Sequence, residues 1–207
     1  MGITPLLRRP GAPRTARRAL SFCAAAVMVA VLAACSDDGL LSPATINNET
    51  RVFSVWAITG TNSALPASYQ VTTESLERPQ MLANGSLNFD VAFDITADGK
   101  VAFHPVRALV PAPPAGAPVV GLGRSGSGFL ALTRAPTGGY ANDTTVVVGA
   151  NEVVTIRLAS SGCILGEPFY AKAVVDSIIL TERRIVLRTM VNRNCGYRAL
   201  TEGLPKN

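Results

Sequence analysis

The chain has 207 residues and a formal net charge of +5. Five of its nineteen lysines and arginines precede Cys35, whereas all fourteen aspartates and glutamates follow it, so the chain after this point is neutral. The charge therefore gives no reason to expect binding to nucleic acid. The 173 residues from Cys35 onward suit one domain, which at this size buries about 70% of the surface of its unfolded chain.

The first 34 residues have the parts of a secretory signal. A positive segment without acidic residues comes first, and its arginines are Arg8, Arg9, Arg14, Arg17 and Arg18. The next sixteen residues, Ala19–Ala34, are apolar apart from Ser21. A helix needs roughly 20 residues to cross the hydrocarbon of a bilayer. We therefore predict that residues 1–34 are a cleaved signal peptide rather than a transmembrane anchor.

The apolar run ends in Leu32-Ala33-Ala34-Cys35, and this ending resembles the lipobox of bacterial lipoproteins. The resemblance covers the first 35 residues only. It implies cleavage before Cys35, attachment of a diacylglycerol to its thiol, and acylation of the freed amine, for example with palmitate. Because each buried methylene contributes about 0.8 kcal/mol, two acyl chains suffice for stable membrane anchoring. The alternative is an ordinary signal peptide cut nearby, which would leave Cys35 unmodified.

The resemblance also implies a place in the bacterial cell envelope. Ser36 after the lipidated cysteine fits the sorting of lipoproteins to the outer membrane, with the domain facing the periplasm or the cell surface. Residues 36–49 are polar and mixed, and such a segment buries too little apolar surface to order itself. We therefore predict a flexible tether over residues 35–50 and a folded domain over residues 51–207.

The first half of this domain has the pattern of strands. Strands are expected at residues 51–59 and 68–75. In residues 87–95 every odd position is large and apolar and every even position is polar or small, which is typical of a strand with one buried face. An Asp-Gly pair then tolerates the positive φ angles of a tight turn. The return strand is expected to start at residues 101–103.

A connection between strands is expected next. Residues 106–118 are rich in proline, which cannot donate to a sheet, so this segment predicts a surface crossover between two sheets. Residues 121–126 have the glycine spacing of a dinucleotide-binding turn, but the strand-like residues 128–133 follow in place of a helix. We interpret residues 121–126 as a mobile glycine-serine loop.

Two further hairpins are predicted in the second half. One joins residues 144–148 to 153–158, and the other joins 169–180 to 185–192. The strands of the second hairpin are apolar on both faces, which predicts either a central position covered on both sides or one face against another molecule. Eight to ten short strands separated by turns predict the all-β class with a single antiparallel β-sandwich, and a closed β-barrel is the alternative.

Two cysteines, Cys163 and Cys195, remain after lipidation. An exported chain meets an oxidising compartment, in which a disulfide is the expected state of such a pair. Closing this loop of 33 residues would stabilise the fold by roughly 3.7 kcal/mol in the chain-entropy description. Free or metal-binding thiols are the alternative, but the pair lacks a Cys-x-x-Cys motif and nearby histidines.

The residues predict no catalytic, cofactor or metal site. The only histidine, His104, precedes a proline and has no visible acid or base partner. Asp90 and Asp94 share one face of a strand, about 13 Å apart, which is too far to hold one ion. A carboxylate pair of the glycosidase kind needs about 5 to 9.5 Å, and different strands could supply it without leaving a sequence pattern.

The predicted function is that of a membrane-anchored lipoprotein whose domain has a non-catalytic binding or structural role in the cell envelope. The alternatives are an envelope hydrolase whose site the fold assembles and a small outer-membrane β-barrel. The early part of the domain is acidic and the late part basic. Early and late strands are therefore expected to be neighbours, with Asp90 and Asp94 near Arg188 and Arg193.

Overall fold

The computed structural model describes residues 41–159 and 162–206. The expected signal peptide and the expected lipidation residue Cys35 lie outside the described residues. Leu41–Asn207 forms one compact unit. Its described part contains ten β-strands, the four-residue helix α2 (Val106–Leu109) and the short 3-10 turn η1 (Leu180–Glu182).

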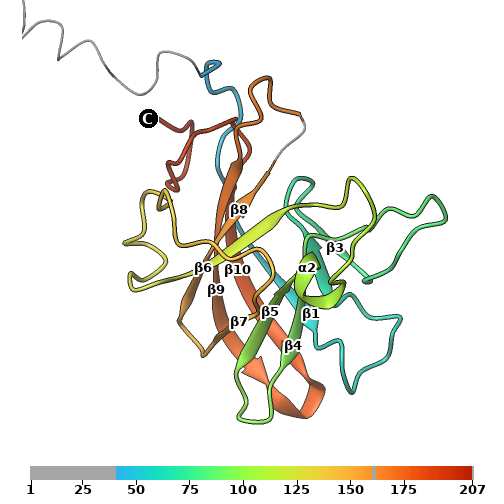
Figure 1. The fold of residues 1–207 in the computed structure, drawn as a ribbon. Coiled ribbons are helices and arrows are strands. Elements are labelled where there is room, and N and C mark those ends of the chain that lie inside the picture. The colour runs from blue at the N-terminus through green and yellow to red at the C-terminus, as the bar shows by residue number, and fades with distance from the viewer. Residues whose placement is uncertain (1–40, 160–161, 207) are drawn as a thin grey trace, which may run out of the picture. The chain divides into compact units, whose positions relative to one another are not determined.

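The ten strands form two antiparallel sheets of five strands each (Figure 1). The first, the β9 sheet, has the order β1 (Thr50–Trp56), β10 (Arg184–Asn192), β9 (Phe169–Ile179), β8 (Val153–Leu158) and β6 (Val120–Ser125). The second, the β4 sheet, has the order β3 (Ser75–Glu77), β2 (Ser68–Gln70), β4 (Val91–Ile95), β5 (Val101–Pro105) and β7 (Val146–Val148). The two sheets are separate and packed together. The predicted β-sandwich is therefore confirmed, and the closed barrel is not the architecture.

The main apolar core lies between the two sheets. Alternate residues of β4 and β5 point into it, and the Phe93 ring meets the Phe103 ring edge-on with centroids 5.1 Å apart. The β9 sheet contributes the buried side chains Val55, Val120, Leu122, Val154, Ile156, Leu158, Ala171, Ala173, Val175, Ile185, Leu187 and Val191. Seven of these twelve residues are β-branched valines or isoleucines, and such side chains pack well on a pleated surface.

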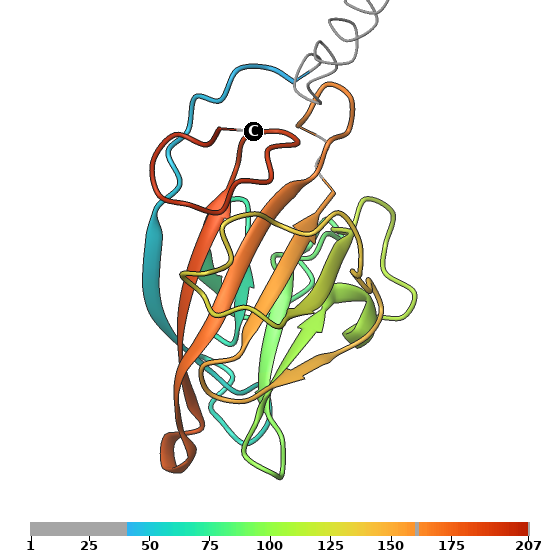
Figure 2. The same cartoon turned by 90° about the vertical axis from the view of Figure 1, so that its left-hand side faces the viewer.

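Strand β9 is buried on both of its faces. Ala173 and Val175 face the main core. Tyr170 and Val174 face the other way and pack in a second apolar cluster with Phe129. This cluster lies under the segment between β6 and β7, which crosses the outer face of the β9 sheet (Figure 2). The central position that the two-faced apolar pattern predicted is confirmed.

The predicted strand at residues 87–95 is shorter than expected. Only Val91–Ile95 forms β4. Leu87 and Phe89 do not enter the main core, because they pack with Ala92 and Val106 in a third cluster on the outer face of the β4 sheet. The face of β4 that the alternation marked as solvated is thus covered at Ala92, with Val106 of helix α2 packed over it.

Three predictions for the middle of the chain are wrong. Residues 120–125 form strand β6, although the sequence predicted a mobile loop at 121–126. Residues 128–133 contain no strand, and residues 129–131 form a turn. Strands β7 and β8 do not form a hairpin, because β7 pairs with β5 while β8 lies between β6 and β9.

The glycines of β6 serve close packing and not mobility. A Cβ atom at Gly121 would lie 2.7 Å from the Cβ atom of Tyr140, and one at Gly123 would lie 2.8 Å from the carbonyl oxygen of Gly139. The backbone of the segment at 139–142 therefore crosses β6 at a distance that only glycine permits. A glycine within a strand often marks such an approach of another backbone.

The proline-rich segment behaves as predicted. Residues 106–118 begin with helix α2 and carry the chain from β5 in the β4 sheet to β6 in the β9 sheet. The segment contains no strand. It is therefore a crossover between the two layers of one domain.

The predicted disulfide between Cys163 and Cys195 is present. Their sulfur atoms lie 2.06 Å apart, and their Cα atoms lie 5.7 Å apart. The bond joins the loop between β8 and β9 to the segment that follows β10. It therefore ties the start of β9 to the end of β10, which are adjacent strands of the β9 sheet, at one end of the sandwich.

Residues 41–49 lie against the same end of the domain. Asn194 accepts hydrogen bonds at Oδ1 from the amides of Thr45 and Ile46, at 2.9 and 3.0 Å, and its Nδ2 donates to the carbonyl of Ile46. Asn48 pairs with Gly203 through two backbone hydrogen bonds. The later part of the predicted tether is therefore attached to the domain, and strand β1 begins at Thr50.

Candidate functional site

A cavity of about 390 Å³ lies where the end of β2, the crossover before β6 and the end of β8 meet. Its wall combines polar side chains from the β4 sheet with apolar groups from the crossover and the β9 sheet. The lining residues are Gln70, Thr72, Asp90, Gly116, Ala117, Pro118, Val119, Leu158 and Ala159. A concave, mainly apolar pocket with a few converging polar groups is the usual form of a small-molecule site.

Asp90 is the only ionisable residue in this lining. Its residue surface is 2% exposed. Its Oδ2 atom accepts a hydrogen bond of 2.7 Å from the amide of Val71. The backbone of Asp90 also accepts from Val106 and donates to Tyr69. The carboxylate is thus fixed in place, immediately before β4, and it holds the turn that follows β2.

Burial raises the pKa of the Asp90 carboxyl from its ordinary value of 3.8 to about 6. Hydrogen bonds from the backbone amides of Val71 and Thr72 act in the opposite direction and keep the rise from being larger. The carboxyl is therefore mainly ionised at neutral pH and takes up a proton in mildly acidic solution. A buried negative charge of this kind can accept hydrogen bonds from a cationic or hydrogen-bond-donating group that enters the cavity.

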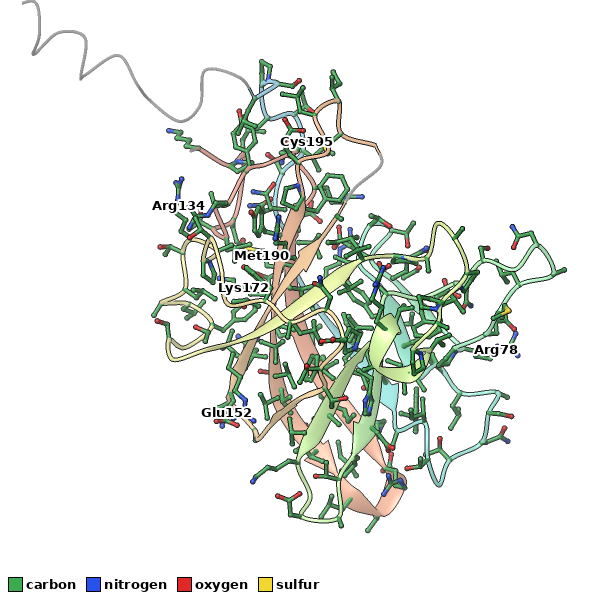
Figure 3. The ribbon with its side chains drawn as sticks, in the orientation of Figure 1. Arg78, Arg134, Glu152, Lys172, Met190 and Cys195 are labelled. Carbon is green, nitrogen blue, oxygen red and sulfur yellow. A yellow bond between two sulfur atoms is a disulfide. The ribbon has the colours of Figure 1, made fainter. Side chains whose placement is uncertain are left out.

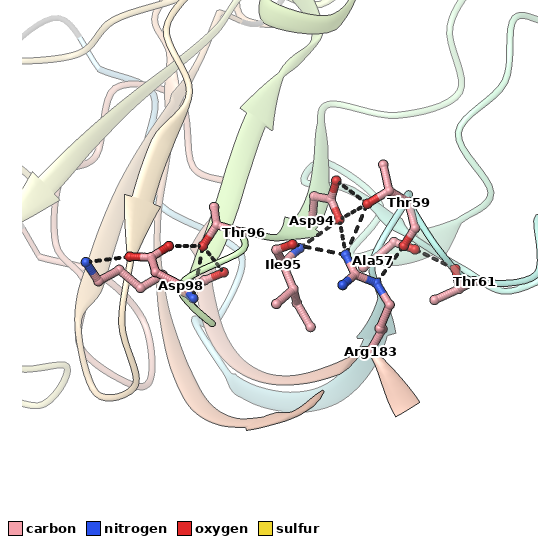
Figure 4. Close-up of polar contacts among 9 residues, drawn as sticks. Ala57, Thr59, Thr61, Asp94, Ile95, Thr96, Asp98 and Arg183 are labelled. Carbon is pink, nitrogen blue, oxygen red and sulfur yellow. Dashed lines mark hydrogen bonds and ion pairs between the residues drawn. The ribbon is translucent and has the colours of Figure 1, made fainter. Parts of the chain in front are cut away.

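Asp94 does not join Asp90 in the cavity. Its Oδ1 atom accepts a hydrogen bond of 2.9 Å from Nη2 of Arg183, and both carboxylate oxygens lie 2.8 Å from the hydroxyl of Thr59 (Figure 4). Arg183 also donates to the carbonyls of Thr59 and Ile95. Arg183 belongs to the turn between β9 and β10, so this network joins the two sheets at the end opposite the disulfide.

His104 has a structural contact and no catalytic partner among the contacts that the structure gives. Its Nδ1 atom lies 2.8 Å from the hydroxyl of Thr145, which immediately precedes the segment of β7. Partial burial lowers the pKa of its imidazole, while the charge of Asp94 acts in the opposite direction. The histidine therefore links β5 to the start of the neighbouring strand.

The early acidic and late basic residues pair in a different combination from the expected one. Arg193 pairs with Glu74, with Nε and Oε1 3.3 Å apart, and Asp94 pairs with Arg183. Arg188 pairs with Asp176 of the adjacent strand β9 at 2.7 Å. Early and late strands are neighbours, as β1 and β10 show, but individual pairs depend on registers that the charge gradient does not reveal.

Lys172 is a buried basic residue that the sequence analysis did not single out. It is 2% exposed, and it lies opposite Met190 across strands β9 and β10 (Figure 3). Its Nζ atom donates to the carbonyls of Phe129 and Leu132, at 2.7 and 3.0 Å, and lies 4.4 Å from the centre of the Phe129 ring. Desolvation lowers the pKa of this amine. The lysine therefore fastens the segment after β6 to the outer face of the β9 sheet.

Both buried charges leave a signal in the sequence. Lys172 stands alone between alanines in an apolar run, and Asp90 precedes the apolar start of β4. A lone charge within an apolar strand must find buried partners, because leaving it unpaired is costly. The pattern could have identified both residues, although it could not have named their partners.

The described residues contain no group of three or more His, Cys, Asp or Glu side chains placed to hold a metal ion. Among the same residues, no helix is long and apolar enough to cross a membrane. Comparison of the chain with protein-family models, with curated proteins and with solved structures finds no match.

Proposed function

We propose that this chain is a lipid-anchored protein of the bacterial cell envelope and that its β-sandwich is a non-catalytic binding domain. One observation carries the proposal: a lipobox-like ending at Cys35 stands six residues before Leu41, where the described, disulfide-bonded domain begins. A disulfide fits an exported protein, because oxidising compartments preserve such bonds. The anchor and the domain are therefore close neighbours along the chain.

Metabolic labelling with a fatty acid tests the anchor. We expect the wild-type chain to incorporate the label and to enter the detergent phase of a membrane extract, and the Cys35→Ala variant to lose both properties. Cys23→Ala is the matched control, because Cys23 lies within the predicted leader and its loss should leave labelling unchanged. Continued labelling of the Cys35→Ala variant would contradict the proposal.

The cavity beside Asp90 supports the binding role. It presents one fixed carboxylate, with Gln70 and Thr72 beside it, opposite apolar groups of the crossover and β8, whereas hydrolysis of the glycosidase kind uses a pair of carboxyl groups. This combination suits a small ligand with a cationic or hydrogen-bond-donating group and an apolar body. The binding role therefore rests on the cavity, independently of the anchor.

Amide chemical shifts test the cavity. We expect methylguanidinium to shift the amide resonances of Val71 and Thr72 in a saturable way, and we expect acetate to leave them unchanged. Asp90→Asn should abolish the methylguanidinium response, since the amide carries no charge. A response of the same size in this variant would show that the cation binds elsewhere.

A further inference from the structure

The loop between β8 and β9 presents two large apolar side chains to solvent at its tip. Ile164 is 91% exposed and Leu165 is 67% exposed. Single exposed apolar residues are common on protein surfaces. Here the two are consecutive, and the remainder of this end adds Leu204, which is 52% exposed, and Ile46, which is 36% exposed.

The exposure of this tip is built into the fold. The disulfide of Cys163 stands immediately before the two residues. The amide of Gly166 donates to the carbonyl of Cys163 at 3.0 Å, and the amide of Leu165 lies 3.2 Å from a carboxylate oxygen of Glu167. The turn is therefore closed by hydrogen bonds within the loop, and it leaves both apolar side chains exposed.

The tip lies at the end of the domain where the described chain starts. A Cβ atom at Gly196 would lie 2.7 Å from Cδ2 of Leu41 and 3.3 Å from the Cβ atom of Glu167. Leu41 and the base of the β8–β9 loop thus meet at one glycine, next to Cys195. Figure 2 shows residues 41–48, this loop and the C-terminal segment gathered at one end of the sandwich.

The covalent chain limits the distance from this end to the residue that carries the lipid. Leu41 is six residues after Cys35 in the sequence, and a chain extends by at most about 3.6 Å per residue, which gives about 22 Å. An anchor at Cys35 therefore holds the Leu41 end of the domain close to the membrane surface.

We propose that Ile164 and Leu165 enter the interfacial region of the same bilayer that holds the lipid of Cys35. This inference rests on the proposed lipid anchor. The lipid supplies attachment, and the apolar tip fixes which way the domain stands on the membrane. Apolar side chains at the boundary of headgroups and acyl chains bury their surface there, as in peripheral membrane proteins.

Tryptophan fluorescence of the lipidated protein in vesicles tests the contact. The chain has one tryptophan, Trp56, so Trp56→Phe provides a silent background. In this background, Ile164→Trp should show a blue-shifted emission, and lipids brominated in the upper part of the acyl chain should quench most of it. Vesicles of phosphatidylethanolamine and phosphatidylglycerol serve as the membrane.

Leu180→Trp in the same background is the matched control. Leu180 is 59% exposed and lies at the other end of β9, whose eleven residues span about 36 Å. Its emission should remain red and unquenched.

Flotation of the vesicles is measured in parallel. Protein that fails to float contradicts the lipid anchor, whereas protein that floats without quenching at position 164 overturns the tip contact alone. A blue-shifted but unquenched emission at position 164 means that protein covers the tip, and it also overturns the inference.

Discussion

The buried carboxyl of Asp90 makes a strong prediction for stability as a function of pH. Its pKa is about 6 in the folded chain, against 3.8 as its ordinary value. Between these two values the folded state binds more protons than the unfolded state, so the free energy of unfolding falls as the pH rises. The wild-type protein therefore loses stability between about pH 4 and pH 6 through this residue. The Asp90→Asn variant has no such proton to lose.

The size of the effect follows from the difference between the two pKa values. One unit corresponds to 1.36 kcal/mol, and the rise from 3.8 to about 6 gives a change of about 3 kcal/mol. We expect the stability of the Asp90→Asn variant, measured relative to wild type, to rise by about this amount from pH 3.5 to pH 7.5. The difference in stability between the variant and wild type at one pH also includes the effect of the altered hydrogen bond to Val71. That effect is the same at every pH, so it does not enter the change of the difference with pH.

Urea denaturation of residues 36–207 with the disulfide intact, followed by circular dichroism at a series of pH values, measures this trend. Asp98→Asn is the control, because hydrogen bonds from Thr96 and then Lys100 lower the pKa of the exposed Asp98 carboxyl. A carboxyl whose pKa is lowered in the folded chain stabilises the fold at pH values above its ordinary pKa. The stability of Asp98→Asn relative to wild type should therefore fall as the pH rises, opposite to that of Asp90→Asn. A flat or falling difference for Asp90→Asn would refute the reasoning.

Three other substitutions test the packing. Cys195→Ser should lower the melting temperature in calorimetry by about 10 °C, since a 33-residue loop contributes roughly 3.7 kcal/mol, and an unchanged value contradicts a stabilising bond. Gly123→Ala should cost about 1–3 kcal/mol in urea denaturation because its Cβ atom meets backbone at 2.8 Å, whereas Gly126→Ala, with nothing within 4 Å, should be near neutral. Lys172→Met should lower the free energy of unfolding by about 1–3 kcal/mol, because it leaves the Phe129 carbonyl without its hydrogen bond. Amide hydrogen exchange at residues 126–143 should become faster in this variant. Unchanged exchange would contradict the role of Lys172 in holding this segment on the sheet.

The sequence predicted best those elements whose signals are local. The hairpin of β9 and β10 was visible because two long apolar strands flank a polar turn, and the structure pairs them with one register shift between Val186 and Leu187. The crossover at 106–118 was visible because proline excludes a strand. The disulfide followed from the compartment that the leader implied.

The errors arise where partners are distant in sequence. The chain does turn between residues 148 and 153, where Asn151 has a φ of 65°, but a turn does not tell which sheet each flanking strand will join. Strand β6 was missed because its two glycines were interpreted as a sign of mobility. Their cause is a backbone segment more than ten residues later, which no local pattern contains.

The candidate cavity was also beyond local patterns. Asp90 was noted only as one residue of a strand, and its neighbours in the cavity come from the crossover and from the end of β8. The raised pKa depends on burial by these distant segments. A sequence can therefore identify a lone acid in an apolar context, but the closing of two sheets decides whether that acid is solvated or buried.

The disulfide has a second consequence for the proposed lipid anchor. A load applied through residue 41 reaches the domain through the hydrogen bonds of Thr45 and Ile46 to Asn194. Asn194 precedes Cys195, and the bond from Cys195 to Cys163 passes the load to the loop that starts β9. β9 is the central strand of its sheet, β10 is its neighbour, and both contribute to the two largest apolar clusters of the described residues. A pull from the proposed anchor at Cys35 would therefore act first on two well-packed strands, whereas the cavity at Asp90 is lined by residues outside β9 and β10.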